Sequence, residues 1–249
     1  MKLKNIFIPM IMIVVFCIGI LTIRAMELNK LVKTVNLPKG NTVEIKYVSN
    51  EKIDSKTIQL YKDQNENEYL FLDNELIGYF KEVDITSPNS IAKLNSETIN
   101  DKKENYEAIA FDIAKEIVNK EKTSFADYKL TSNNYVTSYG EFSYTYSKFI
   151  DGYITTDSIT ISLDNNGNLS SFTASRQGIF DKYKDIKIDK EKVNNFIVEE
   201  MKKNYSNIEN YKVQNQFITF TNEKLTLEIQ VELEHTSNEF SLISLYYYL

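Results

Sequence analysis

The most restrictive feature of the sequence is an uncharged apolar run near its N-terminus. Ile6 to Ile23 contain no charged residue; Lys2 and Lys4 precede the run and Arg24 follows it. Eighteen helical residues extend about 27 Å, close to the thickness of a bilayer's hydrocarbon core. We therefore predict a transmembrane helix from Ile6 to Ile23, with residues 1–24 forming an N-terminal membrane anchor.

A cleaved signal peptide is the main alternative to this anchor. The apolar region of a signal peptide is usually about 7–15 residues long and is followed by small residues of the A-x-A type. Here the run is longer, and Ile23-Arg24-Ala25 offers a bulky residue and a charge instead. An uncleaved anchor therefore fits the sequence better.

The orientation of the anchor does not follow from a count of basic residues, because they flank both ends of the run. Lys2 and Lys4 precede it, whereas Arg24, Lys30 and Lys33 follow it. A short head with two lysines is typical of an exported chain, and long downstream domains cross membranes largely regardless of charge. We expect a single-pass protein of the cell membrane with a cytoplasmic N-terminus and an extracytoplasmic C-terminal body.

The body of the chain is acidic and contains no cysteine. Beyond residue 24, 26 lysines and arginines stand against 35 aspartates and glutamates, a net charge of −9. This balance disfavours nucleic acid as a partner. The single cysteine, Cys17, lies in the apolar run, so the body cannot form the disulfides that are common in exported eukaryotic domains. These features favour a bacterial envelope protein that folds on its hydrophobic core alone.

The first part of the body is expected to be small and rich in strands. Residues 25–40 are interpreted as a stalk, because Pro38-Lys39-Gly40 marks a turn at their end. Residues 41–83 alternate between apolar and polar positions and are predicted to form a small β-hairpin module. The polar residues 84–101 are interpreted as a linker.

Two helices are predicted in the rest of the body, each followed by strands. The first, at 102–121, would begin with a capping box formed by Asp101 and Glu104, and the second, at about 189–204, would begin at Asp189. Strand patterns occupy 128–136, 142–149, 153–163, 169–175, 211–221, 224–233 and 240–248. In the last of these, Leu245, Tyr247 and Leu249 are expected to face inward.

The order helix, four strands, helix, three strands predicts the α+β class, with each helix packed on an antiparallel sheet. It also indicates an internal duplication. The first unit would comprise residues 102–182, and a shortened second unit would comprise residues 183–249.

The turns of the first unit resemble those of a known family. Gly152 lies in one turn after the strand that begins at Phe142, and Asp164-Asn-Asn-Gly167 forms the next turn. With a helix before them, these features resemble PepSY-type domains, which occur in YcdB/YcdC-like exported proteins and in the propeptides of thermolysin-like proteases. The resemblance covers about residues 102–176, and its echo at 189–249 lacks both glycines. It implies a non-catalytic protein that restrains or assists a neighbouring secreted peptidase or cell-wall hydrolase.

No group of residues in the sequence specifies a reaction. His235, the only histidine, follows Glu234, but the pair has no second metal ligand or nucleophile beside it. The spacing after Asp164 differs from that of a calcium loop, so a hairpin turn is expected there. We predict no catalytic residue, no metal site and no cofactor. A carboxylate-dependent envelope hydrolase and a structural component of an envelope or sporulation assembly are left open as alternatives.

Four aromatic residues form a candidate partner surface. Tyr144, Tyr146, Phe149 and Tyr153 lie on or beside consecutive predicted strands, and tyrosine is enriched at protein interfaces. The alternative is that these side chains face the helix layer, because tyrosine is also a good strand former. The sequence alone does not distinguish the two positions.

Overall fold

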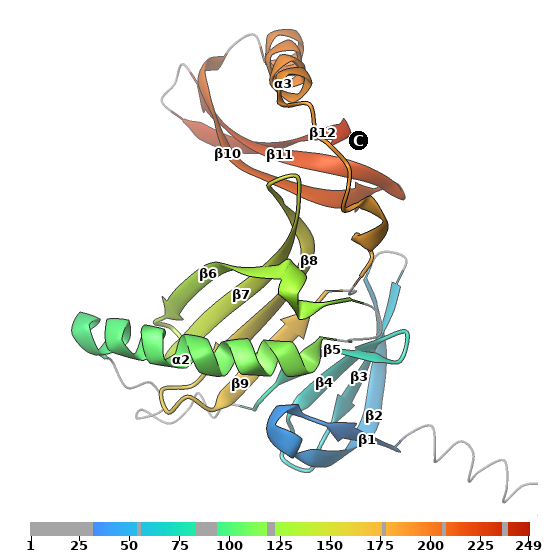
Figure 1. Ribbon diagram of the computed structural model, residues 1–249, viewed down its shortest axis with the longest axis vertical. Helices are drawn as coiled ribbons and strands as arrows, with labels where there is room; N and C mark the ends of the chain where they lie inside the picture. The colour runs from blue at the N-terminus through green and yellow to red at the C-terminus, as the bar shows by residue number, and fades with distance from the viewer. Residues whose placement is uncertain are drawn as a thin grey trace, which may run out of the picture. The chain divides into compact units, whose positions relative to one another are not determined.

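The computed structural model describes residues 32–53, 56–82, 94–118, 123–175, 178–205, 208–235 and 239–249. Within them, two α-helices and twelve β-strands, paired mostly antiparallel, confirm the α+β class (Figure 1). These residues fall into two compact units, one within Met1–Ser87 and one within Pro88–Leu249. The predicted membrane span, Ile6 to Ile23, lies outside them, and none of the described helices is long and apolar enough to cross a membrane.

The first unit is an antiparallel meander with an aromatic core. Tyr61 and Tyr69 are almost completely buried, and the ring of Tyr61 meets that of Phe71 edge-on with centroids 5.2 Å apart. Such contacts add to the free energy gained by burying the rings. The strands pair in sequence order: β1 (Val32–Asn36), β2 (Thr42–Ile53), β3 (Lys56–Lys62), β4 (Glu68–Leu72) and β5 (Glu75–Phe80).

The interpretation of residues 25–40 as a stalk is wrong for its C-terminal part. β1 pairs with β2, with Val35 opposite Val43, and a 3-10 turn at Pro38–Gly40 joins the two strands. Val35 is buried, so this short strand contributes to the core of the meander. Its five residues are too few for the alternation to be recognised in the sequence.

In the second unit, α2 (Ser96–Ile117) lies across a four-stranded antiparallel sheet (Figure 1). Ala110, Ile113 and Ala114 form the buried stripe of the helix. The small alanines allow the helix to approach the strands closely. The sheet has the order β6 (Tyr128–Val136), β7 (Glu141–Ile150), β8 (Tyr153–Leu163) and β9 (Leu169–Ala174).

α2 begins six residues earlier than predicted. Its N-cap is Asn95, whose side chain accepts a hydrogen bond from the backbone N–H of Thr98 at 2.8 Å. The predicted capping box at Asp101 and Glu104 is therefore wrong, and residues 96–101 belong to the helix and not to a linker. This first turn and a half is mostly polar, so it lacks the apolar periodicity by which helices are recognised in a sequence.

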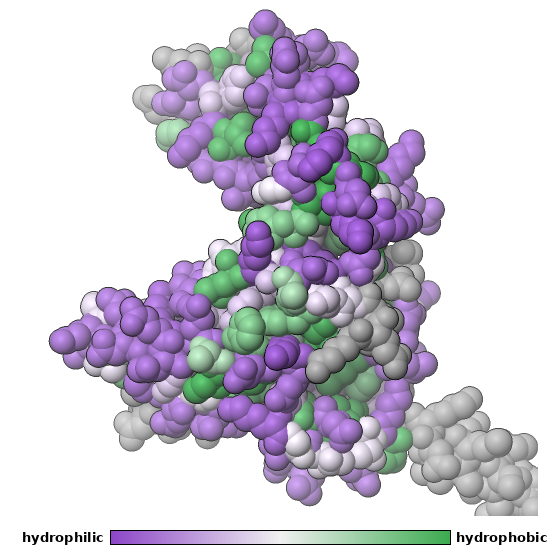
Figure 2. Space-filling view, viewed as in Figure 1, coloured by the Kyte–Doolittle hydropathy of each residue, from purple (hydrophilic) through white to green (hydrophobic). Residues whose placement is uncertain are grey.

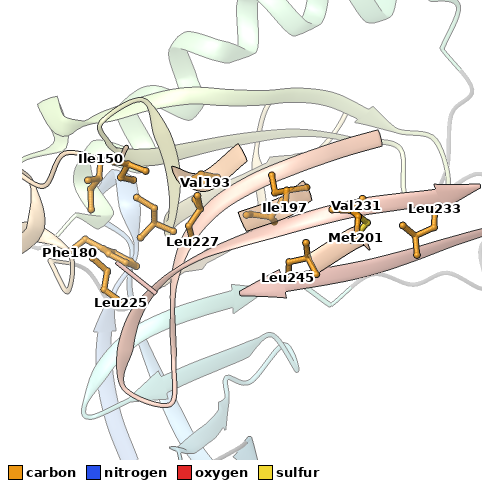
Figure 3. Close-up of a cluster of buried hydrophobic side chains, with 13 residues drawn as sticks. Ile150, Phe180, Val193, Ile197, Met201, Leu225, Leu227, Val231, Leu233 and Leu245 are labelled. Carbon is orange, nitrogen blue, oxygen red and sulfur yellow. The ribbon is translucent and has the colours of Figure 1, made fainter. Parts of the chain in front are cut away.

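α3 (Lys190–Asn204) packs on a second antiparallel sheet, in the order β10 (Ile208–Thr221), β11 (Lys224–His235) and β12 (Phe240–Tyr248). The predicted start at Asp189 is correct to within one residue, since Asp189 is the N-cap and accepts hydrogen bonds from the backbone N–H groups of Glu191 and Lys192 at 3.1 and 3.2 Å. Figure 3 shows the core under α3, where Val193, Ile197 and Met201 of the helix meet Leu227, Val231 and Leu245 of the strands.

The two sheets of the second unit touch through a short parallel pairing. Phe217 and Ile218 of β10 lie beside Ile154 and Thr155 of β8. The turn between β7 and β8 has positive φ at both central residues, Asp151 (49°) and Gly152 (88°), as a tight hairpin of this type requires. The prediction of a turn at Asp-Gly is confirmed.

The inward side of β12 is only partly as predicted. Leu245 is buried and Tyr247 is half-buried, with its ring centroid 5.3 Å from that of Phe196 in α3. Leu249 is 37% exposed, so the prediction that it faces inward is wrong. It lies beyond the last residue of the strand, and its backbone N–H donates to the carbonyl of Leu225 at 3.0 Å.

Deleting residues 244–249 is expected to unfold the sheet of β10, β11 and β12. The deletion removes Leu245 and Tyr247 from the core under α3 and leaves five of the nine β11 residues that pair with β12 without their outer partner. The loss of a buried leucine alone typically costs about 2–5 kcal/mol. The check is thermal unfolding of the full chain and the truncated chain in the same detergent. An unchanged midpoint would contradict the assigned role of this segment.

Candidate functional site

The aromatic side chains predicted as a partner surface do not form one face. Tyr144 and Tyr146 of β7 are 0% and 3% exposed and lie under α2, where their hydroxyl groups donate to the backbone carbonyls of Lys103 (2.8 Å) and Glu107 (3.3 Å). Burial raises the pKa of both hydroxyls. The prediction of an exposed surface is therefore wrong for these two residues, which hold the helix on the sheet.

Phe149 and Tyr153 lie apart from that pair, because Phe149 occupies an odd position of β7 and Tyr153 belongs to β8. Both are half-buried. Tyr153 packs against the core under α3, and Lys129 places its ammonium 5.4 Å from the centroid of the Phe149 ring. The four residues therefore serve different local contacts and do not act as one group.

The most strongly buried charge of the second unit is Asp157 in β8, which the sequence analysis did not single out. Its side chain is 0% exposed and accepts hydrogen bonds from the Tyr128 hydroxyl at 2.6 Å, the Gly178 backbone N–H at 3.0 Å and the Ser175 hydroxyl at 3.2 Å. Burial raises the pKa of Asp157. The three hydrogen bonds and the charge of the nearby Lys148 ammonium both lower this pKa, but they cancel the effect of burial only in part. Asp157 thus ties β6, β8 and the loop before α3 together.

Lys148 of β7 is the matching buried cation. It donates hydrogen bonds to the Thr123 hydroxyl and to Asp181, and its ammonium lies 5.4 Å from the centroid of the Tyr128 ring. Asp127 contributes a further carboxylate at 3.8 Å. The Lys148 side chain is 6% exposed, whereas those of Asp181 and Asp127 are 39% and 62% exposed, so a buried ammonium reaches carboxylates near the surface. We call such a set of polar contacts a clasp, and its role is structural.

The first unit contains a similar clasp around Asp63. Its carboxylate accepts hydrogen bonds from the Tyr69 hydroxyl (2.9 Å), the Asn67 side chain (2.8 Å) and the backbone N–H groups of Asn65 and Asn67 (2.7 and 3.1 Å). Burial alone would raise the pKa of Asp63, but these bonds outweigh it and hold the pKa below its usual value. The carboxylate borders a polar cleft of about 670 Å³ in this unit, but its acceptor positions are already occupied.

His235 and Asp164 have local structural partners. The His235 ring nitrogen Nε2 lies 2.8 Å from the Ser241 hydroxyl, across the β11–β12 hairpin. Asp164 accepts hydrogen bonds from the backbone N–H groups of Asn166 and Asn168 (2.8 and 2.9 Å), which is the geometry of a turn. Among the described residues, no group of three or more His, Cys, Asp or Glu side chains is placed to hold a metal ion.

The feature best suited to binding is a row of apolar side chains on β12. Phe240, Leu242, Tyr246 and Tyr248 are 64%, 62%, 42% and 53% exposed, and we call them the β12 row. They occupy even positions, on the face opposite α3, whereas the odd positions include the buried Leu245. Much of the face visible in the space-filling view is hydrophilic, with apolar residues in smaller patches (Figure 2). Exposed apolar residues that gather on one strand are typical of an interaction site.

The same even positions direct their backbone groups to the outer edge of the sheet. The ladder bonds at the two ends of the β11–β12 pair involve Leu249 and Glu239, both at odd positions. Because hydrogen-bonded and non-hydrogen-bonded pairs alternate along an antiparallel ladder, the even residues point their N–H and C=O groups away from β11. Within the described chain, β12 pairs with β11 alone. The β12 row therefore combines exposed side chains with open backbone groups.

The sequence offered one indication of this row that was overlooked. Residues 240–249 contain no charge, and four of their five even positions are apolar or aromatic. The inward positions alone were predicted from the alternation. No protein-family model, no curated protein and no solved structure matches the chain.

Replacing Tyr128 by phenylalanine is expected to lower the free energy of unfolding by about 1–3 kcal/mol, because it leaves a buried carboxylate with one donor fewer. Tyr139→Phe is the matched control, since Tyr139 is 64% exposed, and its effect should stay within about 0.5 kcal/mol. Denaturant unfolding of the two variants provides the comparison. Equal effects would show that the bond to Asp157 contributes nothing to stability.

Asp157→Asn and Asp63→Asn are expected to show opposite pH dependence. The raised pKa of folded Asp157 means that its contribution to stability is complete below about pH 4 and is lost as the pH rises through that pKa. The lowered pKa of folded Asp63 means that its contribution is complete above about pH 4 and is lost as the pH falls.

Melting temperatures at about pH 3.5 and pH 7 test this difference. The decrease caused by Asp157→Asn should be larger at the acidic pH, and that caused by Asp63→Asn should be larger at neutral pH. The parent chain, measured in the same buffers, is the reference at each pH. Decreases that change with pH in the same direction for both variants would contradict the assigned environments.

Proposed function

We propose that the protein is a single-pass, membrane-anchored binding protein of the bacterial cell envelope. Its extracytoplasmic body would restrain or assist a secreted peptidase or a cell-wall hydrolase. The observation that carries this proposal is the β12 row, an exposed apolar strand face on a body whose net charge is otherwise strongly negative. A surface of this kind is costly to expose to water unless a partner covers it.

The interior polar groups support a binding role and not a catalytic one. Asp63, Asp157 and Lys148 are engaged by several hydrogen-bond partners within the fold. A catalytic acid or base needs a position from which it reaches a substrate proton, and these groups are committed to neighbouring residues. The resemblance to PepSY-type domains agrees with this role, because two helix-on-sheet arrangements follow one another along the chain.

Site-specific photocrosslinking in living cells tests the proposal. A photoreactive phenylalanine at Tyr246 is expected to capture one dominant extracytoplasmic peptidase or wall hydrolase, identified by mass spectrometry. The same group at Tyr139 is the matched control, because Tyr139 is an exposed tyrosine in the turn between β6 and β7. Capture of that enzyme at Tyr246 and not at Tyr139 is the expected result.

Three other outcomes would overturn the proposal. Crosslinks only between copies of the chain would favour a structural component of an envelope assembly. Cytoplasmic proteins alone would reverse the assigned topology. Hydrolysis of peptidoglycan or casein by the purified protein, retained in a Tyr246→Ser variant, would favour an enzyme that uses carboxylates.

A further inference from the structure

β12 lacks the features that normally protect the edge of a sheet. Native edge strands commonly carry a charge, a proline or a bulge that prevents pairing with another chain. Residues 240–249 include neither a charged residue nor a proline. The pairing of β12 with β11 runs without a register shift from Phe240 to Tyr248, so the edge is regular along its length. Such an edge can accept an added strand.

A row of glutamates borders the β12 row on its inner side. Glu228, Glu232 and Glu234 of β11 are each directly opposite a member of the β12 row. None of the three forms an ion pair with another residue in the described parts of the chain. The nearby cations are Lys212, opposite Glu232, and Lys224, over the ring of Tyr248. The face therefore combines apolar surface with an excess of negative charge.

We infer that β12 binds an extended segment of a partner protein that carries lysine or arginine at alternate positions. This inference rests on the proposed function, since it specifies the segment through which the partner enzyme is held. The backbone of the segment pairs with the outward N–H and C=O groups of β12, which is a known mode of peptide recognition. Charge complementarity with the β11 glutamates selects the basic side chains.

The spacing of strands places basic side chains where the glutamates can meet them. Neighbouring strands lie about 4.8 Å apart, so an added strand lies about 10 Å from β11. A lysine or arginine side chain that extends toward β11 covers part of that distance, and the glutamate side chain that extends toward it covers the rest. Their apolar stems then cover Leu242, and their charged ends pass over the Tyr246 and Tyr248 rings, a favourable cation–π arrangement.

A second copy of the chain fits this edge poorly. β12 has no basic residue, so pairing it with itself would place two glutamate rows on one face, which Lys212 and Lys224 of each copy compensate only in part. Each copy also carries a net charge of −6, which opposes association. The acidic flank therefore favours a basic partner segment over self-pairing.

Peptide binding to the full chain tests the inference directly. The protein is held in nanodiscs of phosphatidylcholine, because a neutral lipid does not attract basic peptides. The probe is a fluorescent peptide of nine residues, the length of β12, with lysine or arginine alternating with threonine. Its control has glutamate at the basic positions. The expected result is binding of the basic probe only, weakening as salt is added; equal binding of both peptides would overturn the inference.

Two sets of variants separate the contributions of backbone and charge. Ser244→Pro removes an outward N–H that β11 does not use, together with the hydroxyl that donates to Glu228 at 2.8 Å, and should weaken binding about tenfold. Ser244→Ala loses the same hydroxyl but keeps the N–H, so it is the matched control and should bind like the parent. Exchange of Glu228, Glu232 and Glu234 for glutamine should remove the salt dependence and leave the fold intact. Unchanged binding in either Ser244→Pro or the glutamine variant overturns the inference.

The failure of this inference can be told apart from the failure of the proposed function. If the basic probe does not bind but crosslinking at Tyr246 still captures an extracytoplasmic enzyme, only the inference falls. If the probe binds as expected but crosslinking captures no such enzyme, the proposed function falls and the specificity of β12 stands. Crosslinks between two copies at Tyr246 would overturn both.

Discussion

The second unit depends on one repeated arrangement, in which an amphipathic helix buries a single face against an antiparallel sheet. The body has no cysteine, so its stability comes from such burial and not from disulfides. Ala110 and Ile113 of α2, and Ile197 of α3, lie in the two layers of contact. A two-layer arrangement covers only one face of each sheet. The exposed face of β10, β11 and β12 is therefore a direct consequence of the way the unit is stabilised.

Buried polar groups hold the segments that do not pack against α2 or α3. Asp157 accepts donors from Tyr128 and Gly178, which are far from it in sequence, and Lys148 reaches Asp181 in the turn before α3. Burying these charges carries a desolvation cost, which their partners reduce. Because both side chains are buried, they secure the loop between the two sheets of the unit and are not exposed to a substrate.

The sequence predicted features set by local chemistry and missed those set by distant contacts. The Asp189 cap and the turn at Asp151 and Gly152 follow from short-range backbone geometry, and both are confirmed. The alternation of β7 was visible, but a period of two does not say which face is covered, so the sequence left Tyr144 with two possible positions, at a partner surface or facing the helix. The environment of Asp157 could not be predicted, because it is created by residues about twenty to thirty positions away in the chain.

The coincidence of open backbone groups and exposed side chains on β12 follows from antiparallel geometry, because both alternate with a period of two. In an edge strand with one buried face, the open backbone groups belong either to the exposed or to the buried residues, and in β12 they belong to the exposed ones. Composition then decides what the strand does. β1 and β6, which also pair on one side only in the described chain, carry Lys33 and Lys129. β12 has no charge, and its nearest acids lie one strand inward. A strand added beside β12 contacts the apolar side chains of β12, and the glutamates of β11 lie one strand further in. This arrangement favours a basic segment and opposes an acidic one.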